Sequence, residues 1–536
     1  MKGSKFDELL THLGTGKWNL LYFLTSSYWS LWLPGEYFSG IFLSPEMKFV
    51  CKPPENASVA GIAEDSCSYY INETLLSENR TIREMPCTEW DYDTSVYTST
   101  LTAEFNLVCG QEYLRATYQS LLVFSTMFTS SFAGYLADRF GRRTVVIISL
   151  VLYDIVSIVT TLARNISTIL ALRFITGAFF LPTFYVLSLE VCEVKNRSLV
   201  GIVTGFPWAV GTIIWGGLAY LIRDWRYLKL TNSLPTLLAL PCLYFLDESP
   251  RWLIVQGDHT RTMKVLRKAA RWNKVELPSE TDLKKIFLEV QKEQSQLEKN
   301  KENSSSNQGF ESRNWLRVPR LLRTPKIRMI ITMMSISLFI VSLAYCGVSL
   351  SGHVYSSDPF LFMVILGVMQ MPSYTVTAPL INWKGRKIPS IILFLISGAS
   401  IMTLGFIPDD LTWLLMTLAM IGMLCVSSVY MILFVFLSEL LPTEVRLQSI
   451  GVTSVFAQIA AAIAPYITLY IGPSGLWLPS VIYGGTCFLA ALTLLPLPET
   501  LGVPMLETVD QLENEVKRHI KPNTIDTEEE LKKLNA

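Results

Sequence analysis

The chain has 536 residues, of which 50% are hydrophobic and 17% are charged, and its formal net charge is +0 at pH 7. A soluble protein usually carries about a quarter charged residues. This composition therefore argues against an ordinary soluble domain, and no excess of basic charge points to nucleic acid as a partner.

Long apolar runs alternate with short charged connectors along the chain. A run of roughly 18 apolar residues is long enough to cross a membrane, and about twelve such runs occur here. They are expected to be helices because hydrocarbon offers the backbone no hydrogen-bond partner. The predicted spans lie near residues 18–42, 112–136, 144–163, 168–190, 198–222, 230–246, 327–351, 358–381, 388–407, 411–437, 448–471 and 475–496. The first run begins only near Trp18 and lacks a small-residue cleavage pattern, so it is not expected to be a signal peptide.

Lys and Arg set the expected orientation of the spans. Basic connectors are expected in the cytoplasm together with both termini, and they lie at 138–143, 193–197, 247–326, 384–387 and 443–446. The connectors 408–410 and 472–475 are poor in cations and are expected outside. The stretch RDWRYLK at 223–229 is an exception, because it carries three cations on the predicted outer side.

The segment 44–111 should then lie outside the cell. It carries four of the nine cysteines, Cys51, Cys67, Cys87 and Cys109. An even cysteine set in an oxidising compartment predicts two disulfides, with three connectivities open. Three N-x-S/T sequons in the same segment predict glycosylation at Asn56, Asn72 or Asn79.

The two halves of the chain carry matching residues between their spans. Gly141-Arg142 after the second span recurs as Gly385-Arg386 after the eighth, and DESPRW at 247–252 has a counterpart in PETLG at 498–502. Glu190 precedes Arg197 by the same interval that separates Glu439 from Arg446. Such parallel repeats predict two halves related by an axis along the membrane normal, with the ligand site between them near the midplane.

These motifs resemble those of a known family. GYLADRFGRR at 134–143 is similar to the loop after the second helix of major facilitator proteins, and PLINWKGRK at 379–387 repeats it without the acidic residue. Four further stretches resemble the organic cation, anion and carnitine transporter branch, which is solute carrier family 22; they lie at 86–120, 224–253, 437–446 and 497–502. The resemblance covers about residues 5–510 and is specific for the family but not for a substrate.

The resemblance implies an all-α integral membrane fold with twelve transmembrane helices in two parallel six-helix repeats. The expected parts are the cytoplasmic N-terminus with helix 1 (1–43), the disulfide-bonded extracellular loop (44–111), helices 2–6 (112–250), the cytoplasmic linker (251–326), helices 7–12 (327–500) and the cytoplasmic tail (501–536). The linker is expected to be a solvated tether, and the alternative is a regulatory role.

Charged residues at the predicted cytoplasmic helix ends are candidates for gating. Carboxylate–guanidinium pairs could hold helix ends together in one access state and separate in the other. The candidates are Asp138, Arg139, Arg142, Glu190, Arg197, Glu439 and Arg446. The alternative is that these cations only anchor loops inside, which we favour for Arg143 and Lys384.

A carboxylate lies among aromatic rings in the first span. Trp29, Trp32 and Glu36 fall on one helix face, so they could form a wall that accepts a cation. The alternative is an interfacial aromatic belt from which Glu36 reaches water. Pro34 and Gly35 could kink the helix and move this face.

Other substrate-site candidates come from positions in the family. The resemblance implies aromatic pocket residues at Tyr185, Trp208, Tyr345 and Tyr430, although each could instead serve packing. Gln370 and Gln458 replace residues that are charged in relatives, and an amide does not select a charge sign. Asp154, in the third span, is either a structural hydrogen-bond partner or a proton or cation site, and Arg173 resembles a structural ion-pair partner.

Together these features predict a polyspecific secondary transporter, a facilitator or exchanger of small organic cations or zwitterionic amines that uses alternating access at the plasma membrane. The alternatives are an organic anion exchanger of the same family and a receptor that binds ligand without transporting it. No phosphate-binding G-x-x-x-x-G-K-[ST] motif, metal-ligand cluster or nucleophile–base pair occurs, so we expect no enzyme, cofactor or metal. The expected partners are a small organic ion and membrane lipid, and the outer loop is a candidate surface for self-association.

Overall fold

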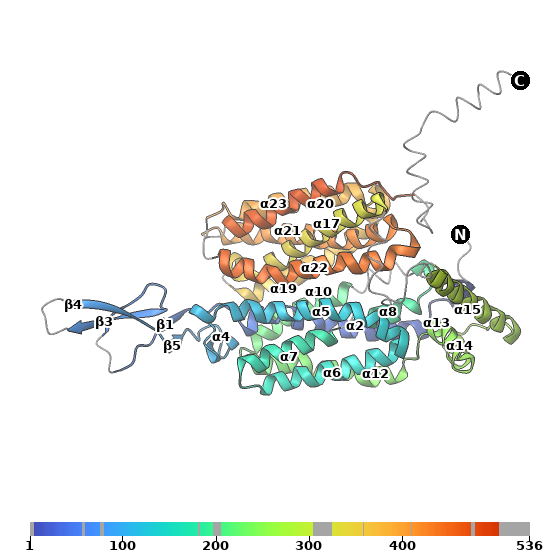
Figure 1. Cartoon of the computed structure of the whole chain (residues 1–536), viewed down its shortest axis with the longest axis horizontal. Coiled ribbons are helices and arrows are strands. Elements are labelled where there is room, and N and C mark those ends of the chain that lie inside the picture. The colour runs from blue at the N-terminus through green and yellow to red at the C-terminus, as the bar shows by residue number, and fades with distance from the viewer. Residues whose placement is uncertain are drawn as a thin grey trace, which may run out of the picture. The chain divides into compact units, whose positions relative to one another are not determined.

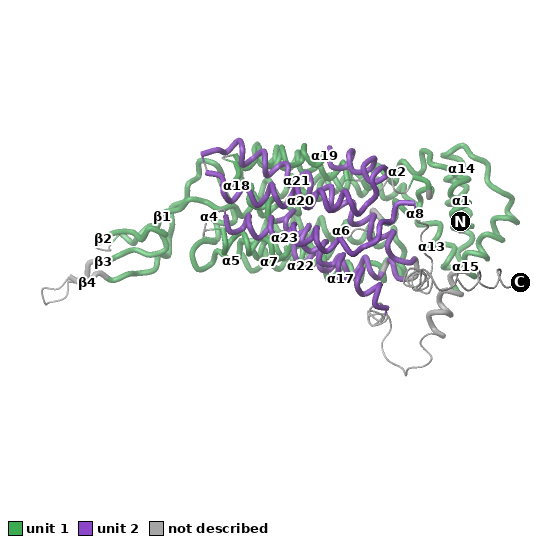
Figure 2. The backbone as a smooth tube through the Cα atoms, turned by 90° about the horizontal axis from the view of Figure 1, so that it is seen from above, with its two compact units in different colours: residues 1–306, 347–371, 461–475 green, residues 307–346, 372–460, 476–536 purple. Residues whose placement is uncertain are grey.

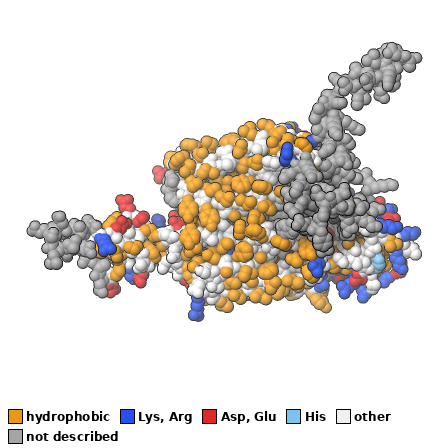
Figure 3. Space-filling model, viewed as in Figure 1, with side chains coloured by type: hydrophobic (Ala, Val, Ile, Leu, Met, Phe, Trp, Pro, Cys, Tyr) orange, Lys and Arg blue, Asp and Glu red, His pale blue; other side chains and the backbone are white. Residues whose placement is uncertain are grey.

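The structure is a computed structural model, and it describes residues 5–55, 59–74, 80–180, 183–196, 205–303, 324–356, 358–408, 410–472 and 477–502. Most of these residues are helical, and the strands are confined to the segment after the first span (Figure 1). On the face shown in Figure 3, hydrophobic side chains cover the long helices, as expected for helices that contact lipid.

Each predicted span coincides with one helix or with consecutive helices. In the first half of the chain these are α2 (Lys17–Tyr37) with α3 (Ser39–Leu43), α5 (Tyr113–Phe140), α6 (Arg142–Leu162), α7 (Ile166–Phe179) with α8 (Thr183–Glu190), α10 (Gly205–Leu221), and α11 (Trp225–Ser233) with η3 (Pro235–Leu238) and α12 (Ala239–Phe245). In the second half they are α17 (Pro325–Leu350), α19 (Pro359–Lys384), α20 (Lys387–Leu404), α21 (Thr412–Leu440), α22 (Thr443–Ile471) and α23 (Trp477–Leu494).

Some of the spans are interrupted. Within the described residues, seven helices are by themselves long and apolar enough to cross a membrane, or up to eight if the bent pair Cys109–Ser130 and Phe132–Phe140 is one span. Span six is divided at Pro235, which has no backbone N–H to continue the helical bonding. Pro34 lies inside α2, which ends at Tyr37 before α3 begins.

The chain folds into two compact units (Figure 2). The first comprises residues 1–306, 347–371 and 461–475, and the second comprises residues 307–346, 372–460 and 476–536. The boundaries between the units fall inside α17, α19 and α22, so the units do not follow the two sequence halves everywhere.

A helical cap covers one end of the first unit. It consists of α1 (Lys5–Leu13), α13 (Pro250–Val255), α14 (His259–Asn273) and α15 (Glu280–Asn303). Phe6, Leu9, Leu10 and Leu13 form the apolar face of α1 and are buried in the same core cluster as residues of α13–α15. The Asn273 amide links these parts, because it donates to the Leu13 carbonyl at 3.1 Å and accepts from the Trp18 N–H at 3.1 Å.

The segment after the first span folds into two small sheets. Strand β1 (Phe49–Cys51) pairs antiparallel with β5 (Trp90–Tyr92), and the second sheet has the order β2 (Val59–Ile62), β3 (Ser68–Thr74) and β4 (Arg80–Pro86). Disulfides join Cys51 to Cys87 and Cys67 to Cys109. The predicted pair of disulfides is thus confirmed, and one of the three connectivities is selected.

The predicted glycosylation sites stay predictions. Asn56 and Asn79 lie outside the described residues, and Asn72 belongs to β3 without a described side chain. The remaining short elements are α4 (Leu101–Glu104), η1 (Cys109–Gln111), η2 (Val194–Asn196) and α18 (Gly352–Tyr355).

Candidate functional site: two matched clasps and a buried charge cluster

A clasp of charged residues joins helix ends in the first unit. Arg142, the first residue of α6, binds Asp138 at 2.7 Å and Glu190 at the end of α8 at 3.1 Å. Its guanidinium also donates to the Ala137 carbonyl at 3.3 Å. One arginine therefore ties the ends of α5 and α8 to the start of α6.

A second carboxylate completes this clasp from the segment that follows span six. Glu248 accepts hydrogen bonds from the Arg143 backbone N–H at 3.0 and 3.2 Å. A carboxylate at this place satisfies free N–H groups and complements the positive end of the helix dipole. Gly141 leaves room for it: φ is 94° there, and a Cβ atom would lie 2.4 Å from Glu248 Oε2.

The second unit repeats this geometry. Arg386 binds Glu439 of α21 at 2.8 Å and donates to the Ile381 carbonyl at 3.2 Å. Glu499 accepts from the backbone N–H groups of Arg386 at 2.9 Å and Lys387 at 3.0 Å. Gly385 has a φ of 83°, matching Gly141. The pairs Arg142–Glu190 and Arg386–Glu439 thus correspond between the two units, as do the carboxylates of Glu248 and Glu499 at the following helix start.

The clasps include some of the predicted gating residues and not others. Glu190 and Glu439 pair with Arg142 and Arg386, whereas Arg197 lies outside the described residues. Arg139 instead donates to the Tyr135 hydroxyl at 3.0 Å, and Arg446 donates to the Leu441 carbonyl at 3.3 Å.

Glu499 provides a pH-dependent test of the second clasp. Partial burial alone would raise its pKa, but hydrogen bonds from the backbone N–H groups of Arg386, Thr500, Lys387 and Leu501 outweigh burial and hold the pKa below the ordinary 4.5. The ionised carboxylate therefore stabilises the fold above pH 4.5, and this contribution is lost as the pH falls through the lowered pKa. We expect Glu499→Gln to reduce the loss of stability below pH 4.5 in thermal unfolding.

The control for this measurement is Glu276→Gln, because Glu276 is exposed in the connector before α15. This variant should follow the wild-type pH profile. The assignment fails if Glu499→Gln and wild type lose stability in parallel as the solution is acidified.

A buried charge cluster lies among α2, α6, α7 and α11 of the first unit. The Glu36 side chain is 0% exposed, and its carboxylate binds Arg173 and Lys229, which are 1% and 2% exposed. Lys229 Nζ lies 2.6 Å from Glu36 Oε1, and Arg173 also donates to the Glu36 carbonyl at 2.9 Å. The Tyr153 hydroxyl donates to the same carboxylate at 3.4 Å. One carboxylate thus faces two cations.

This arrangement differs from the surroundings expected for Glu36. The sequence suggested a carboxylate free to receive a ligand ammonium or to reach water, whereas both of its oxygens are bound inside the protein. Trp29, expected on the same ligand-facing side, is 5% exposed and its ring packs 5.0 Å from that of Tyr153. The expectation that Arg173 forms a structural ion pair agrees with the structure.

Lys229 is the member of the cluster that the sequence reasoning missed. The sequence places Lys229 in a connector outside the membrane, but α11 begins already at Trp225. Asp224 caps this helix by accepting from the backbone N–H groups of Arg226 at 2.9 Å and Tyr227 at 3.2 Å. An Asp directly before a helical pattern is a sequence signal for a helix start, and it would have placed the start of this helix at Trp225.

The other cations of RDWRYLK also have specific partners, which accounts for their place on the predicted outer side. Arg226 forms a bidentate pair with Glu104 of α4, including a contact at 2.6 Å. Burial alone would raise the pKa of Glu104, but hydrogen bonds from Arg226 and Trp225 hold the pKa below 4.5. The Arg223 guanidinium lies 5.5 Å from the Tyr220 ring centroid and 5.7 Å from that of Phe360.

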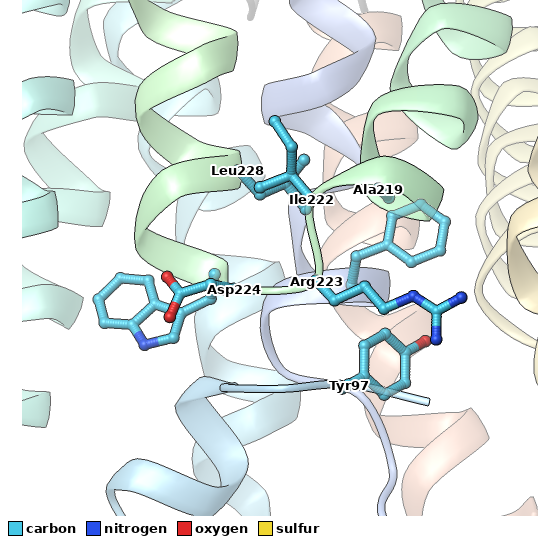
Figure 4. A pocket seen from close by; sticks show the side chains of 8 residues that line it. Tyr97, Ala219, Ile222, Arg223, Asp224 and Leu228 are labelled. Carbon is cyan, nitrogen blue, oxygen red and sulfur yellow. The ribbon is translucent and has the colours of Figure 1, made fainter. Parts of the chain in front are cut away.

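A small pocket, too narrow to enclose a water molecule, lies at this junction. Figure 4 shows Arg223 extending beside Tyr97 there, and the remaining lining residues are Phe42, Ala219, Ile222, Asp224, Trp225 and Leu228. Ligand pockets usually measure about 300–1,000 Å³. We therefore interpret this pocket as a packing feature between α10–α11 and the segment that follows the first span.

The predicted substrate residues are divided between the two units. Trp32, Glu36, Trp208 and Gln370 belong to the first unit, Tyr345, Tyr430 and Gln458 belong to the second, and the side chain of Tyr185 is not described. The Trp208 ring lies 5.6 Å from Tyr37, and the Tyr430 ring lies 5.2 Å from Phe434. That these residues line one cavity stays a prediction.

Asp154 is buried and forms no ion pair with the residues that the structure describes. It is 1% exposed and accepts a hydrogen bond from Thr236, while its Oδ2 atom has no hydrogen-bond partner in the described part of the chain. In that part there is also no group of three His, Cys, Asp or Glu side chains that could hold a metal. Asp154 therefore has a hydroxyl partner on one carboxylate oxygen and no described partner on the other.

Comparisons with known proteins agree with this architecture. The model of the Sugar (and other) transporter family matches residues 66–512. The chain is 31% identical to an organic cation transporter protein of Drosophila melanogaster, covering 98% of this chain and 97% of the relative. It is 28% identical to human organic anion transporter 3, covering 96% and 95% of the two chains.

Solved structures show the fold. The xylose transporter XylE from E. coli, in a partially occluded inward-open conformation, matches 90% of this chain and 98% of its own with a TM-score of 0.61 and 17% identity. A second XylE structure, described as a major facilitator proton:xylose symporter, has a TM-score of 0.59 and covers 93% of this chain. With matched clasps in both units, many apolar spans and relatives over nearly its whole length, the chain belongs to the Sugar (and other) transporter family of the major facilitator superfamily, in the branch of the organic cation and organic anion transporters.

Proposed function

We propose that this protein is a secondary transporter, either a facilitator or an exchanger, that moves small organic cations or zwitterionic amines across the plasma membrane by alternating access. The observation that carries the proposal is the pair of matched clasps, one in each unit. Interactions that bind helix ends together and can be broken are what alternating access requires. A receptor that only binds its ligand would not need the same clasp twice.

The proposed substrate class rests on two observations. The organic cation transporter of Drosophila melanogaster is similar over nearly the whole of both chains. At position 458 this chain has a neutral glutamine, which can donate to or accept from a zwitterion. In this proposal Gln370, Gln458 and the aromatic residues contact substrate, whereas Glu36 serves the buried charge cluster.

A second candidate is an organic anion exchanger. Human organic anion transporter 3 is also similar over nearly the whole chain. In addition, the buried charge cluster combines two cations with one carboxylate and so carries an excess positive charge.

We propose that both termini and the helical cap are cytoplasmic and that the disulfide-bonded segment is extracellular, following the distribution of Lys and Arg.

The test is uptake by proteoliposomes containing the purified protein, with labelled tetraethylammonium, benzoate and betaine as cationic, anionic and zwitterionic probes. Gln458→Asp should raise the ratio of cation to anion uptake and Gln458→Arg should lower it. A unit charge about 6 Å from a charged ligand changes its energy enough to move the ratio roughly tenfold or more. Gln458→Asn is the neutral control and should keep the wild-type ratio.

Two results would contradict the proposal. Equal ratios in all the variants would remove Gln458 from the substrate site. Binding of a probe without accumulation over time would favour the receptor.

We propose Asp154 as the proton or ion site, and uptake by the Asp154→Asn variant at two pH values tests this role. If Asp154 is the site, the variant should lose the pH dependence of uptake that wild type shows.

A further inference from the structure

Helix α14 presents a basic face beside the end of span six, and we propose that this face binds anionic phospholipid headgroups of the membrane that the protein spans. Lys264, Lys268 and Arg271 occupy positions i, i+4 and i+7 and so lie on one side of the helix. The other side is buried in the helical cap through Thr262, Val265, Leu266, Ala269 and Ala270. The core therefore fixes which side of α14 remains accessible.

The contacts of Lys268 place this basic face next to the membrane-spanning helices. Its ammonium group donates to the carbonyl of Phe245, the last residue of α12, at 2.9 Å and binds Asp247 at 2.8 Å. The Tyr244 and Phe245 side chains are 78% and 56% exposed at this helix end. Large exposed rings at the end of a span are typical of the layer between hydrocarbon and water.

An aromatic residue of α14 itself belongs to the same surface. Trp272 is 37% exposed, and Lys268 Nζ lies 5.5 Å from the centre of its ring. Membrane proteins often place Trp together with Lys and Arg at the level of the lipid headgroups. The basic face thus continues from the exposed rings at the end of span six.

The charges on this face are only partly balanced. In the described residues, neither Lys264 nor Arg271 forms an ion pair, whereas Lys268 shares Asp247. The acidic residues Asp258 and Glu280 pair with Arg261 and Arg267 on adjoining positions of the helix. Figure 3 shows blue side chains interspersed with red ones at the end of the molecule that carries α14 and α15. Lipid phosphates at headgroup level carry the charge that would balance Lys264 and Arg271.

The experiment uses the full-length protein, purified in an uncharged detergent and stripped of lipid. Native mass spectrometry measures its binding of phosphatidylglycerol, of phosphatidylcholine and of soluble glycerol phosphate. The test variants are Lys264→Gln/Arg271→Gln and the triple variant that adds Lys268→Gln. The control Lys284→Gln/Lys285→Gln/Lys292→Gln removes three exposed cations from α15.

Each cation near an anionic surface strengthens binding about fivefold, so the triple variant should bind phosphatidylglycerol roughly 100-fold more weakly and the double variant roughly 25-fold more weakly. Binding of phosphatidylcholine should not change, and the control should resemble wild type. The double variant keeps the Lys268 contacts, so it can still measure the contribution of the basic face to lipid binding if the triple variant fails to fold.

Three results would overturn the proposal. The double variant could fold and retain phosphatidylglycerol binding, or the α15 control could lose as much binding as the triple variant. Glycerol phosphate could also bind as tightly as the lipid, which would make the face a site for free anions. None of these results depends on which substrate is transported.

Discussion

Glu36→Gln should be the most damaging single substitution in the first unit, with an expected loss of about 3–5 kcal/mol of stability, because it leaves Arg173 and Lys229 buried without a counter-charge. The loss should appear as a lower unfolding temperature and a smaller fraction of monodisperse protein in detergent. Both cations are almost fully buried, so water cannot replace the missing carboxylate.

Lys229→Met is the matched comparison for this prediction. It removes one cation and leaves a balanced Glu36–Arg173 pair in which Arg173 still binds the Glu36 carbonyl and stacks 4.5 Å from the Tyr118 ring. We expect it to be much less damaging than Glu36→Gln, since an apolar side chain of similar length fills the space. Equal stability of Glu36→Gln and wild type, together with weaker uptake of a cationic probe, would return Glu36 to the substrate site.

Arg386→Gln should weaken the clasp of the second unit and shift the equilibrium between access states by roughly 10–150-fold. This range corresponds to about 1.5–3 kcal/mol for hydrogen bonds that involve charged groups. The substitution leaves Glu439 without its guanidinium partner and removes the bond to the Ile381 carbonyl. Faster hydrogen exchange at the start of α20 and a changed uptake rate would report the shift.

The control is Lys384→Gln, which removes a positive charge from the same connector. Lys384 is exposed and lies 4.0 Å from the centre of the neighbouring Trp383 ring rather than in the clasp. The Lys384→Gln variant should leave hydrogen exchange at α20 and the uptake rate near their wild-type values. Arg142→Gln in the first unit should resemble Arg386→Gln, with a larger effect because Arg142 has two carboxylate partners. If Lys384→Gln slowed uptake as much as Arg386→Gln, general charge loss would be responsible.

The clasps were the part of the site that the sequence predicted best. Gly, Arg and Glu residues recur at similar intervals in both halves, and these are the residues in contact. The local partner could not be predicted for Glu190, because the repeat alone fits Arg197 and Arg142 equally well. The choice depends on the turn at Gly141, which points Arg142 toward the end of α8.

The buried charge cluster was predictable only in part. An acidic residue in an apolar run is conspicuous, and Glu36 was identified for this reason. Its partners come from α7 and α11, far away in the sequence, and Lys229 lies in a stretch whose charges suggested a loop. Likewise, four cysteines predicted two disulfides, but the connectivity follows from how the strands pair.

The burial of α1 against the linker helices affects how the protein is made. The ribosome completes α1 about 250 residues before it reaches the core residues of α14, which at about 5–20 residues per second corresponds to roughly 12–50 s. Throughout that interval Phe6, Leu9, Leu10 and Leu13 have no α14 or α15 to cover them. The nascent chain thus carries an amphipathic helix with an exposed apolar face at its N-terminus while its first six spans enter the bilayer. This exposed face makes the helix a natural target for chaperones during synthesis.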